Sequence, residues 1–170
     1  MKKTLLVFVM LTVTAIQTFA QNTLPSVSLK KLDGSTFNSD SIQNNGKPII
    51  ICLWATWCQP CIEEFDAIAE EYPDWQKQTG VKLIAVSVDN PKTMSKVKTT
   101  VDSRDWGFEY YTDASEDFKH AIGATYCPYT IVLNAQRQIV WKSSSSSPGS
   151  EEELFEIVKK VAAGESVSDK

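Results

Sequence analysis

Residues 49–61 have the sequence IIICLWATWCQPC, and this stretch decides the fold. It opens with a continuously apolar run, which is typical of a strand buried on both faces of a sheet. Helical spacing of apolar residues follows from about Gln59 to Tyr72, where Pro73 is expected to end or kink the helix. The sequence therefore predicts a strand-to-helix corner that carries two cysteines.

Cys58 and Cys61 occupy the start of that predicted helix, separated by Gln59 and Pro60. This separation allows a disulfide across the first helical turn. The first sulfur lies where unpaired backbone N–H groups and the positive end of the helix dipole lower the pKa of a thiol. Pro60 has no N–H to lose in the first turn and fixes φ for the helix. We expect Cys58 to be an exposed nucleophile and Cys61 a more buried resolving thiol.

A structural disulfide and a metal site are the other interpretations of this cysteine pair. A structural disulfide is rarely placed at a strand-to-helix corner between aromatic residues. A metal site usually needs a second ligand pair with zinc-like spacing. The single histidine, His120, lies in a predicted helix with no paired ligand beside it, so it is better explained as a surface residue or one at a helix C-terminus.

The rest of the chain alternates strands and helices. A second buried strand is predicted at 81–88, and Asp89, Asn90 and Pro91 indicate the N-cap and first turn of a polar helix that reaches about Ser103. The other predicted elements are a hairpin around Asp33-Gly34 (27–31 and 35–37), a strand at 108–111, a helix at 115–122, a second hairpin (129–133 and 138–141) and a last helix capped by Ser150. This order predicts an α/β fold with a mixed sheet.

The N-terminus has the pattern of a secretory signal. Lys2 and Lys3 precede an apolar run at 5–16, and small residues follow up to Ala20. We expect residues 1–20 to be a signal peptide that is cleaved near Ala20, which places the protein in the periplasm. An uncleaved membrane anchor is the alternative, although the apolar run is shorter than the about 20 residues that a spanning helix needs.

Composition and charge narrow the classes of function. Of 170 residues, 42% are hydrophobic and 22% are charged, as in ordinary globular proteins. Without residues 1–20, 15 basic and 21 acidic residues remain, a formal net charge of −6. This balance favours neither nucleic acid nor an anionic membrane surface as a partner. All four cysteines lie in the exported part, where disulfides persist.

The segment 53–61, Leu-Trp-Ala-Thr-Trp-Cys-Gln-Pro-Cys, matches the active-site signature of the thioredoxin fold. The chain resembles the TlpA/ResA-like periplasmic thiol:disulfide oxidoreductases, a redoxin or AhpC/TSA-like group of that superfamily. The resemblance covers nearly the whole mature chain and implies a thioredoxin-like domain at 21–164. That domain has a central mixed sheet flanked by helices, an N-terminal β-hairpin and an extra helix inserted after the second core strand. Residues 165–170 are expected to be a flexible tail.

Glu64 matches the buried active-site glutamate of this family, three residues after the second cysteine. On a helical wheel with Cys61 at zero, Glu64 lies about 60° from Cys61, whereas Glu63 points in roughly the opposite direction from Cys61. Glu64 can therefore border the site as a proton acceptor for the resolving thiol, while Glu63 is solvated. The alternative is that both are ordinary acidic residues favoured by the dipole near a helix start.

Pro128 matches the family's proline that follows a cis peptide bond and packs against the active-site disulfide. The sequence departs from the family at two further cysteines. Cys52 stands where thioredoxin has a buried acid and is explained as a small apolar residue. Cys127 precedes Pro128, so the resemblance places it near the active-site sulfurs. There it can be a third redox thiol, a soft metal ligand with Cys58 and Cys61, or a passive substitute for Val.

The resemblance implies an enzyme that reduces disulfides in exported proteins such as apocytochrome c. Cys58 would attack and Cys61 would resolve, with Trp57, Gln59 and Pro60 contacting the substrate or tuning the redox potential. No histidine stands beside the nucleophile, which points to a reductant. We expect a monomer that receives electrons from a membrane thiol carrier and needs no cofactor or metal besides its redox-active disulfide.

Two alternatives remain for the function. A peroxiredoxin-like thiol peroxidase also carries the N-terminal hairpin, but it needs an arginine to hold the peroxide. The chain has only two arginines, Arg104 and Arg137, and both stand in places that match this need poorly. A metal-binding module would use Cys58, Cys61 and Cys127.

Overall fold

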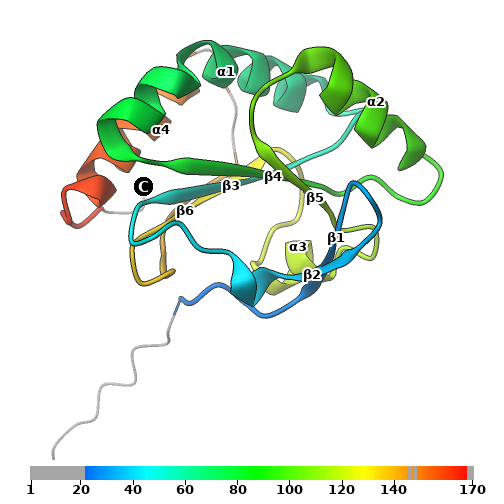
Figure 1. Cartoon of the computed structure of the whole chain (residues 1–170), viewed down its shortest axis with the longest axis horizontal. Coiled ribbons are helices and arrows are strands. Elements are labelled where there is room, and N and C mark those ends of the chain that lie inside the picture. Colours follow the sequence, from blue (N-terminus) through cyan, green and yellow to red (C-terminus); the bar gives the residue numbers. More distant parts are fainter. Residues whose placement is uncertain (1–21, 145–146, 148, 168–170) are drawn as a thin grey trace, which may run out of the picture.

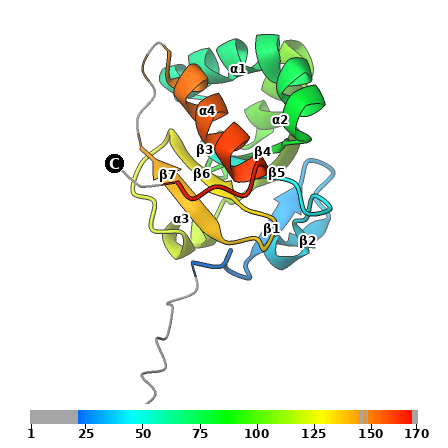
Figure 2. The ribbon, with the colours of Figure 1, turned by 90° about the vertical axis from the view of Figure 1, so that its left-hand side faces the viewer.

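A mixed seven-stranded sheet with the order β2-β1-β5-β4-β3-β6-β7 forms the centre of the molecule. The computed structural model describes residues 22–144, 147 and 149–167. Helices α1, α2 and α4 lie over one face of the sheet and α3 lies on the other (Figures 1 and 2). The elements are β1 (Ser28–Lys31), β2 (Thr36–Asn38), the short 3-10 helix η1 (Ser39–Ser41), β3 (Ile49–Trp54), α1 (Gln59–Thr79), β4 (Lys82–Ser87), α2 (Ser95–Arg104), β5 (Glu109–Thr112), α3 (Asp117–Ala121), β6 (Tyr129–Leu133), β7 (Ile139–Ser143) and α4 (Ser150–Ala162).

This architecture confirms the predicted α/β class and central mixed sheet. The predicted signal peptide at 1–20 lies outside the described residues, as do positions 168–170 of the expected tail. Within the part of the chain that the structure describes, no helix is both long and apolar enough to cross a membrane.

Strand β3 occupies an interior position in the sheet, as its apolar run predicts. Every residue of β3 is buried. It pairs in parallel with β4, Ile49 opposite Lys82, and antiparallel with β6, Ile49 opposite Leu133. Because β3 and β4 are parallel, their last residues, Trp54 and Ser87, lie side by side at one edge of the sheet. This edge is where the cysteine-bearing corner begins.

The N-terminal hairpin forms at the predicted Asp-Gly turn. The Gly34 N–H donates to the Lys31 carbonyl at 2.9 Å, and the Asp33 carboxylate accepts from the Ser35 N–H at 2.8 Å. Strand β1 then pairs antiparallel with β5 through Lys30 and Lys31, so the hairpin extends the sheet on that side.

Helix α1 is longer than the sequence predicts, because Pro73 neither ends nor breaks it. The second half of the helix is held by packing: the Trp75 ring is buried and stacks on Phe155 of α4, with centroids 4.8 Å apart and planes 5° apart. Such packing offsets the roughly 3 kcal/mol that a proline costs inside a helix. The helix ends instead at Gly80, whose φ of 70° is readily adopted by glycine.

Three other helix boundaries differ from the prediction. Asn90 does not cap α2: its side chain accepts from the Lys92 N–H at 2.9 Å in a separate turn, and the α-helix begins only at Ser95. Helix α3 is shorter than the predicted 115–122. Ser150 is the first residue of α4, not its cap, because Gly149 holds the N-cap position with a left-handed φ of 88°.

Candidate active site

The cysteine pair lies where β3 gives way to α1. Cys58 is the N-cap residue of α1, and its N–H donates to the Ala55 carbonyl at 3.0 Å, which tightens the turn between strand and helix. Cys58 and Cys61 form a disulfide with their Cα atoms 5.3 Å apart. The structure thus places a disulfide across the first turn of the helix, where the sequence predicts it.

Cys58 is less exposed than the sequence predicts. Its side chain is 5% exposed in the disulfide form, and Cys61 is 0% exposed. The expectation of an exposed nucleophile is therefore wrong for this form, in which the Cys58 sulfur is bonded to Cys61 and has the Cys127 sulfur within 4.8 Å. The order of accessibility is nevertheless as predicted, since the helix buries Cys61 more completely.

The loop before β6 brings a third sulfur to this site. Tyr129, the first residue of β6, pairs with Leu53 near the end of β3, and the Cys127–Pro128 peptide bond just before it is cis. The Sγ atoms of Cys58, Cys61 and Cys127 all lie within 4.8 Å of one another. Cys127 is a free thiol of intermediate burial, and burial raises its pKa.

This proximity predicts an alternative pairing when Cys61 is absent. After mild oxidation of Cys61→Ser, we expect peptide mapping by mass spectrometry to find a Cys58–Cys127 disulfide, formed more slowly than the native bond because it closes a longer loop. The wild type, treated identically, should contain only the Cys58–Cys61 bond. A Cys52–Cys127 bond in the wild type would contradict this arrangement.

Two exposed aromatic side chains directly precede cysteines of this cluster in the sequence, Trp57 before Cys58 and Tyr126 before Cys127. Trp57 is 61% exposed and Tyr126 is 78% exposed, and they are the exposed large hydrophobic residues of the described chain. Gln59 and Pro60, between the two bonded cysteines, are exposed as well. The exposure of Tyr126 was not predicted, although its place directly before Cys127 was a usable signal.

A buried acid holds the loop that precedes Cys58. Asp89 is 0% exposed, and its carboxylate accepts hydrogen bonds from the Thr56 N–H (2.8 Å), the Thr56 hydroxyl (2.7 Å) and the Ser87 hydroxyl (2.9 Å). Asp89 follows β4 and Thr56 follows β3, so the parallel pairing of these strands brings them together. The sequence placed Asp89 at a helix start. Its true position could have been found from the rule that parallel strands end at a common edge.

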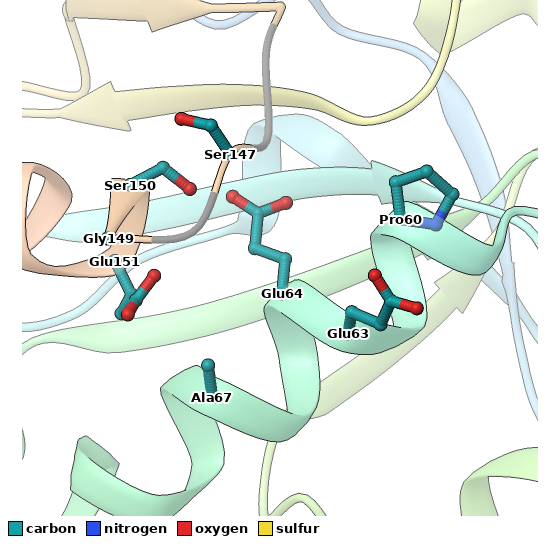
Figure 3. Close-up of a pocket in the computed structure, with 8 residues that line it drawn as sticks. All are labelled: Pro60, Glu63, Glu64, Ala67, Ser147, Gly149, Ser150 and Glu151. Atoms are coloured by element: carbon teal, nitrogen blue, oxygen red, sulfur yellow. The ribbon is translucent and has the colours of Figure 1, made fainter.

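Glu64 is buried and Glu63 is exposed on α1, as the helical wheel predicts, although both side chains border one pocket. Glu64 is 8% exposed, whereas Glu63 is exposed and accepts a hydrogen bond from the Gln59 amide at 2.9 Å. Glu64 lines a pocket of about 290 Å³ between α1 and the segment that carries Ser147 and Ser150. Figure 3 shows the Glu64 carboxyl group in this pocket. Its Oε2 atom is buried and has no hydrogen-bond partner among the described residues.

Burial, with a smaller contribution from the negative charge of Glu151 at the start of α4, raises the pKa of Glu64 to about 7. Glu151 lines the same pocket. This carboxyl group can therefore hold or release a proton near neutral pH, which is the property that a proton acceptor or donor requires. The contribution of Glu151 to the pKa of Glu64 was not predicted, because the two residues belong to segments far apart in the sequence.

The raised pKa of Glu64 predicts a pH-dependent stability. Folded Glu64 keeps its proton to a higher pH than unfolded Glu64, so stability falls as pH rises from about 4.5 to about 7. In urea unfolding of the oxidised protein, the free energy of unfolding of the wild type should fall by on the order of 2–3 kcal/mol between about pH 5 and pH 8 because of this group. Glu64→Gln should not show this fall. Glu63→Gln is the matched control and should keep the wild-type pH slope. Equal slopes for the wild type and Glu64→Gln would contradict the burial of this charge.

Comparison with known proteins now identifies the family. The model of the AhpC/TSA family matches residues 20–142. The chain belongs to the AhpC/TSA family. A thiol-disulfide oxidoreductase ResA from Geobacillus thermodenitrificans is 29% identical over 118 residues, which cover 69% of this chain and 65% of the relative. The chain therefore spans less than two thirds of the length of this curated relative.

Solved structures show that this AhpC/TSA-family protein has the thioredoxin-like fold. An uncharacterized thioredoxin-like protein from Porphyromonas gingivalis is 39% identical, with a TM-score of 0.74, covering 82% of this chain and 92% of the other. A putative thiol:disulfide interchange protein DsbE from Chlorobium tepidum has a TM-score of 0.72 at 15% identity, covering 84% of this chain and 96% of the other. The second likeness concerns the fold alone.

The remaining candidate residues of this AhpC/TSA-family protein have other contacts. Cys52 is 1% exposed in β3, and the Thr130 hydroxyl donates to its sulfur at 3.4 Å. Burial raises its pKa far above the ordinary value, as expected of a small core residue. Arg104 pairs with Asp66 at 2.5 Å, and the His120 side chain is 69% exposed. The predicted surface position of His120 is confirmed.

Proposed function

We propose that this protein is a thiol:disulfide oxidoreductase whose redox centre is the Cys58–Cys61 pair. The observation that carries the proposal is the disulfide at the N-terminus of α1. Unpaired backbone N–H groups at a helix N-terminus stabilise a thiolate, which is the attacking form of cysteine. The curated relative named thiol-disulfide oxidoreductase ResA supports the same activity.

The first step is an exchange of sulfur bonds. The Cys58 thiolate attacks one sulfur of a substrate disulfide and forms a mixed disulfide. The other substrate sulfur leaves as a thiolate and takes up a proton. No net oxidation has occurred at this stage, because one disulfide bond has replaced another.

The second step completes the transfer of two electrons. Cys61 loses its proton and attacks the Cys58 sulfur, which releases the remaining substrate thiol and leaves the Cys58–Cys61 disulfide. Glu64 lies one helical turn after Cys61 on the buried part of α1. We assign it the role of accepting the Cys61 proton, which its position and its pKa near 7 support.

The proposed substrates are disulfides in exported proteins, apocytochrome c among them. Exposed Trp57 and Tyr126 offer apolar surface for an unfolded or extended substrate segment. The pattern of residues 1–20 supports export to the periplasm. We further propose that the protein acts as a monomer and is returned to the dithiol form by a membrane thiol carrier.

Glu64→Gln is expected to slow turnover of a protein disulfide by roughly tenfold or more, because general acid–base groups contribute about 10²–10⁴-fold to rates. The effect should fall on the resolving step, so a mixed disulfide through Cys58 should build up transiently and be visible by acid quench and mass spectrometry. Glu63→Gln has the same change of charge on the exposed side of α1 and should turn over as the wild type does. Equal rates for both variants would remove the role assigned to Glu64.

The activity itself is tested by mixing the reduced protein with an unfolded protein that holds one disulfide. The proposal expects two new substrate thiols for each Cys58–Cys61 disulfide formed, measured by alkylation and mass spectrometry. Hydrogen peroxide offered instead of the disulfide separates the peroxidase alternative. Faster oxidation by peroxide than by the protein disulfide would overturn the proposed function.

A further inference from the structure

The three clustered sulfurs form a set of soft donor atoms that the disulfide exchange does not fully use. The exchange mechanism needs Cys58 and Cys61, whereas Cys127 remains a free thiol against them. All three Sγ atoms lie within 4.8 Å of one another even while two of them are bonded together. Side chains from two separate segments, the start of α1 and the loop before β6, therefore converge on one point.

This spacing fits a single metal ion bound by three thiolates. With metal–sulfur bonds of about 2.3 Å, three sulfurs around a central ion lie about 4.0 Å apart. Reduction lets the Cys58 and Cys61 sulfurs separate from bonding distance, and Cys127 is already within the required range. We propose that the reduced protein binds one Cu(I) ion through the thiolates of Cys58, Cys61 and Cys127.

The donor set favours Cu(I) over Zn(II). Thiolates are soft ligands that suit Cu(I), zinc and iron–sulfur clusters. Structural zinc is almost always bound by four protein ligands, whereas the cluster in the described part of the chain has three members. The single histidine does not join it, because His120 is exposed on α3 and approaches Glu116 at 3.9 Å.

A cation bound in the cluster would offset part of the negative charge of three thiolates in half-buried and buried positions. A Cu(I) ion with three thiolates carries a net charge of −2. Burial and the negative charges of Asp89 and Glu116 disfavour the Cys127 thiolate. Lys119 on α3, which itself pairs with Glu116 at 3.1 Å, offsets this only in part. The half-buried position of Cys127 and the full burial of Cys61 limit the access of water and competing ligands.

The site is coupled to the redox state of the protein. Reduction of the Cys58–Cys61 bond consumes two electrons and two protons, supplied by a dithiol that becomes a disulfide. The three cysteine thiols then release their protons to solvent as Cu(I) binds, and the copper does not change its oxidation state. Oxidation of the pair to the disulfide removes two of the three ligands, so the oxidised protein should not hold the ion.

The test is a competition for Cu(I) under anaerobic conditions. Full-length protein is reduced, freed of reductant and titrated into the coloured Cu(I) complex of bathocuproine disulfonate, whose absorbance falls as copper is removed. We expect one Cu(I) per wild-type chain, and three sulfur neighbours around the copper in X-ray absorption spectra. The disulfide form, treated in the same way, should remove none.

Variants separate this site from binding by the Cys58–Cys61 pair alone. Cys127→Ala should weaken Cu(I) binding by more than about 100-fold, because loss of a direct ligand exceeds the roughly 10–100-fold cost of losing an outer-shell partner. Cys127→Val, which retains an apolar side chain of similar size, should show the same loss. Cys52→Ala is the matched control: it removes the other free cysteine, lies outside the cluster and should bind as the wild type does.

Wild-type affinity in both folded Cys127 variants would overturn the proposal, as would preferential uptake of Zn(II) from an equimolar mixture with Cu(I). The titration measures binding and not turnover. A protein that binds Cu(I) through Cys127 but fails to reduce protein disulfides would therefore refute the proposed oxidoreductase and leave the metal site standing.

Discussion

Cys58→Ser is expected to lower the rate of protein disulfide reduction by at least about 1,000-fold, as removal of other covalent nucleophiles does. The hydroxyl of serine cannot attack a disulfide sulfur as a thiolate does, even at a helix N-terminus. The measurement is the appearance of substrate thiols after mixing with the dithiol-reduced protein.

Cys61→Ser is the paired variant and should fail differently. It keeps the attacking thiolate but lacks the native resolving thiol, so a mixed disulfide through Cys58 should accumulate and be isolated by non-reducing electrophoresis. Cys127 can attack the Cys58 sulfur of this mixed disulfide and release the substrate only slowly, because it is the less favourable partner of Cys58. Normal turnover by Cys61→Ser would show that the two-cysteine mechanism is wrong.

Asp89→Ala is expected to lower the free energy of unfolding by at least about 3 kcal/mol, since hydrogen bonds to a charged group contribute about 1.5–3 kcal/mol each and three donors lose their partner. Thermal unfolding followed by circular dichroism should show a fall in Tm of at least roughly 10 °C for a domain of this size. Turnover should fall as well, because Asp89 holds the Thr56 backbone two residues before Cys58.

Asp102→Ala is the control for that experiment. Asp102 forms an exposed ion pair with Lys98 at 2.6 Å, and such helix pairs contribute only about 0.3–0.5 kcal/mol. If Asp89→Ala destabilised the protein no more than Asp102→Ala does, the buried carboxylate would not be what holds the loop before Cys58.

The fold and the cysteine corner were predictable because their signals are local. A continuous apolar run predicts the interior strand β3, and the change to helical spacing after it predicts where Cys58 and Cys61 lie. The burial of Glu64 and the exposure of Glu63 follow from the geometry of one helix. None of these inferences needed knowledge of which segments meet in space.

The features that were missed or wrong depend on contacts between distant segments. Pro73 stays inside α1 because Trp75 packs on Phe155 of α4, a contact more than 70 residues away in the sequence. The Cys58 sulfur has the Cys127 sulfur, from the loop before β6, within 4.8 Å. The pKa of Glu64 depends on Glu151, and no pattern within α1 contains that information.

The measurement that tests the central claim most directly is equilibration of the protein with glutathione buffers, followed by trapping of thiols and mass mapping. The account predicts one two-electron transition, with Cys58 and Cys61 as the bonded pair and Cys52 and Cys127 reduced throughout. Its midpoint should lie below about −200 mV, nearer to thioredoxin at about −270 mV than to the strong oxidant DsbA at about −120 mV. A midpoint near the value of the strong oxidant, or a transition that bonds Cys52 or Cys127 in the wild type, would contradict it.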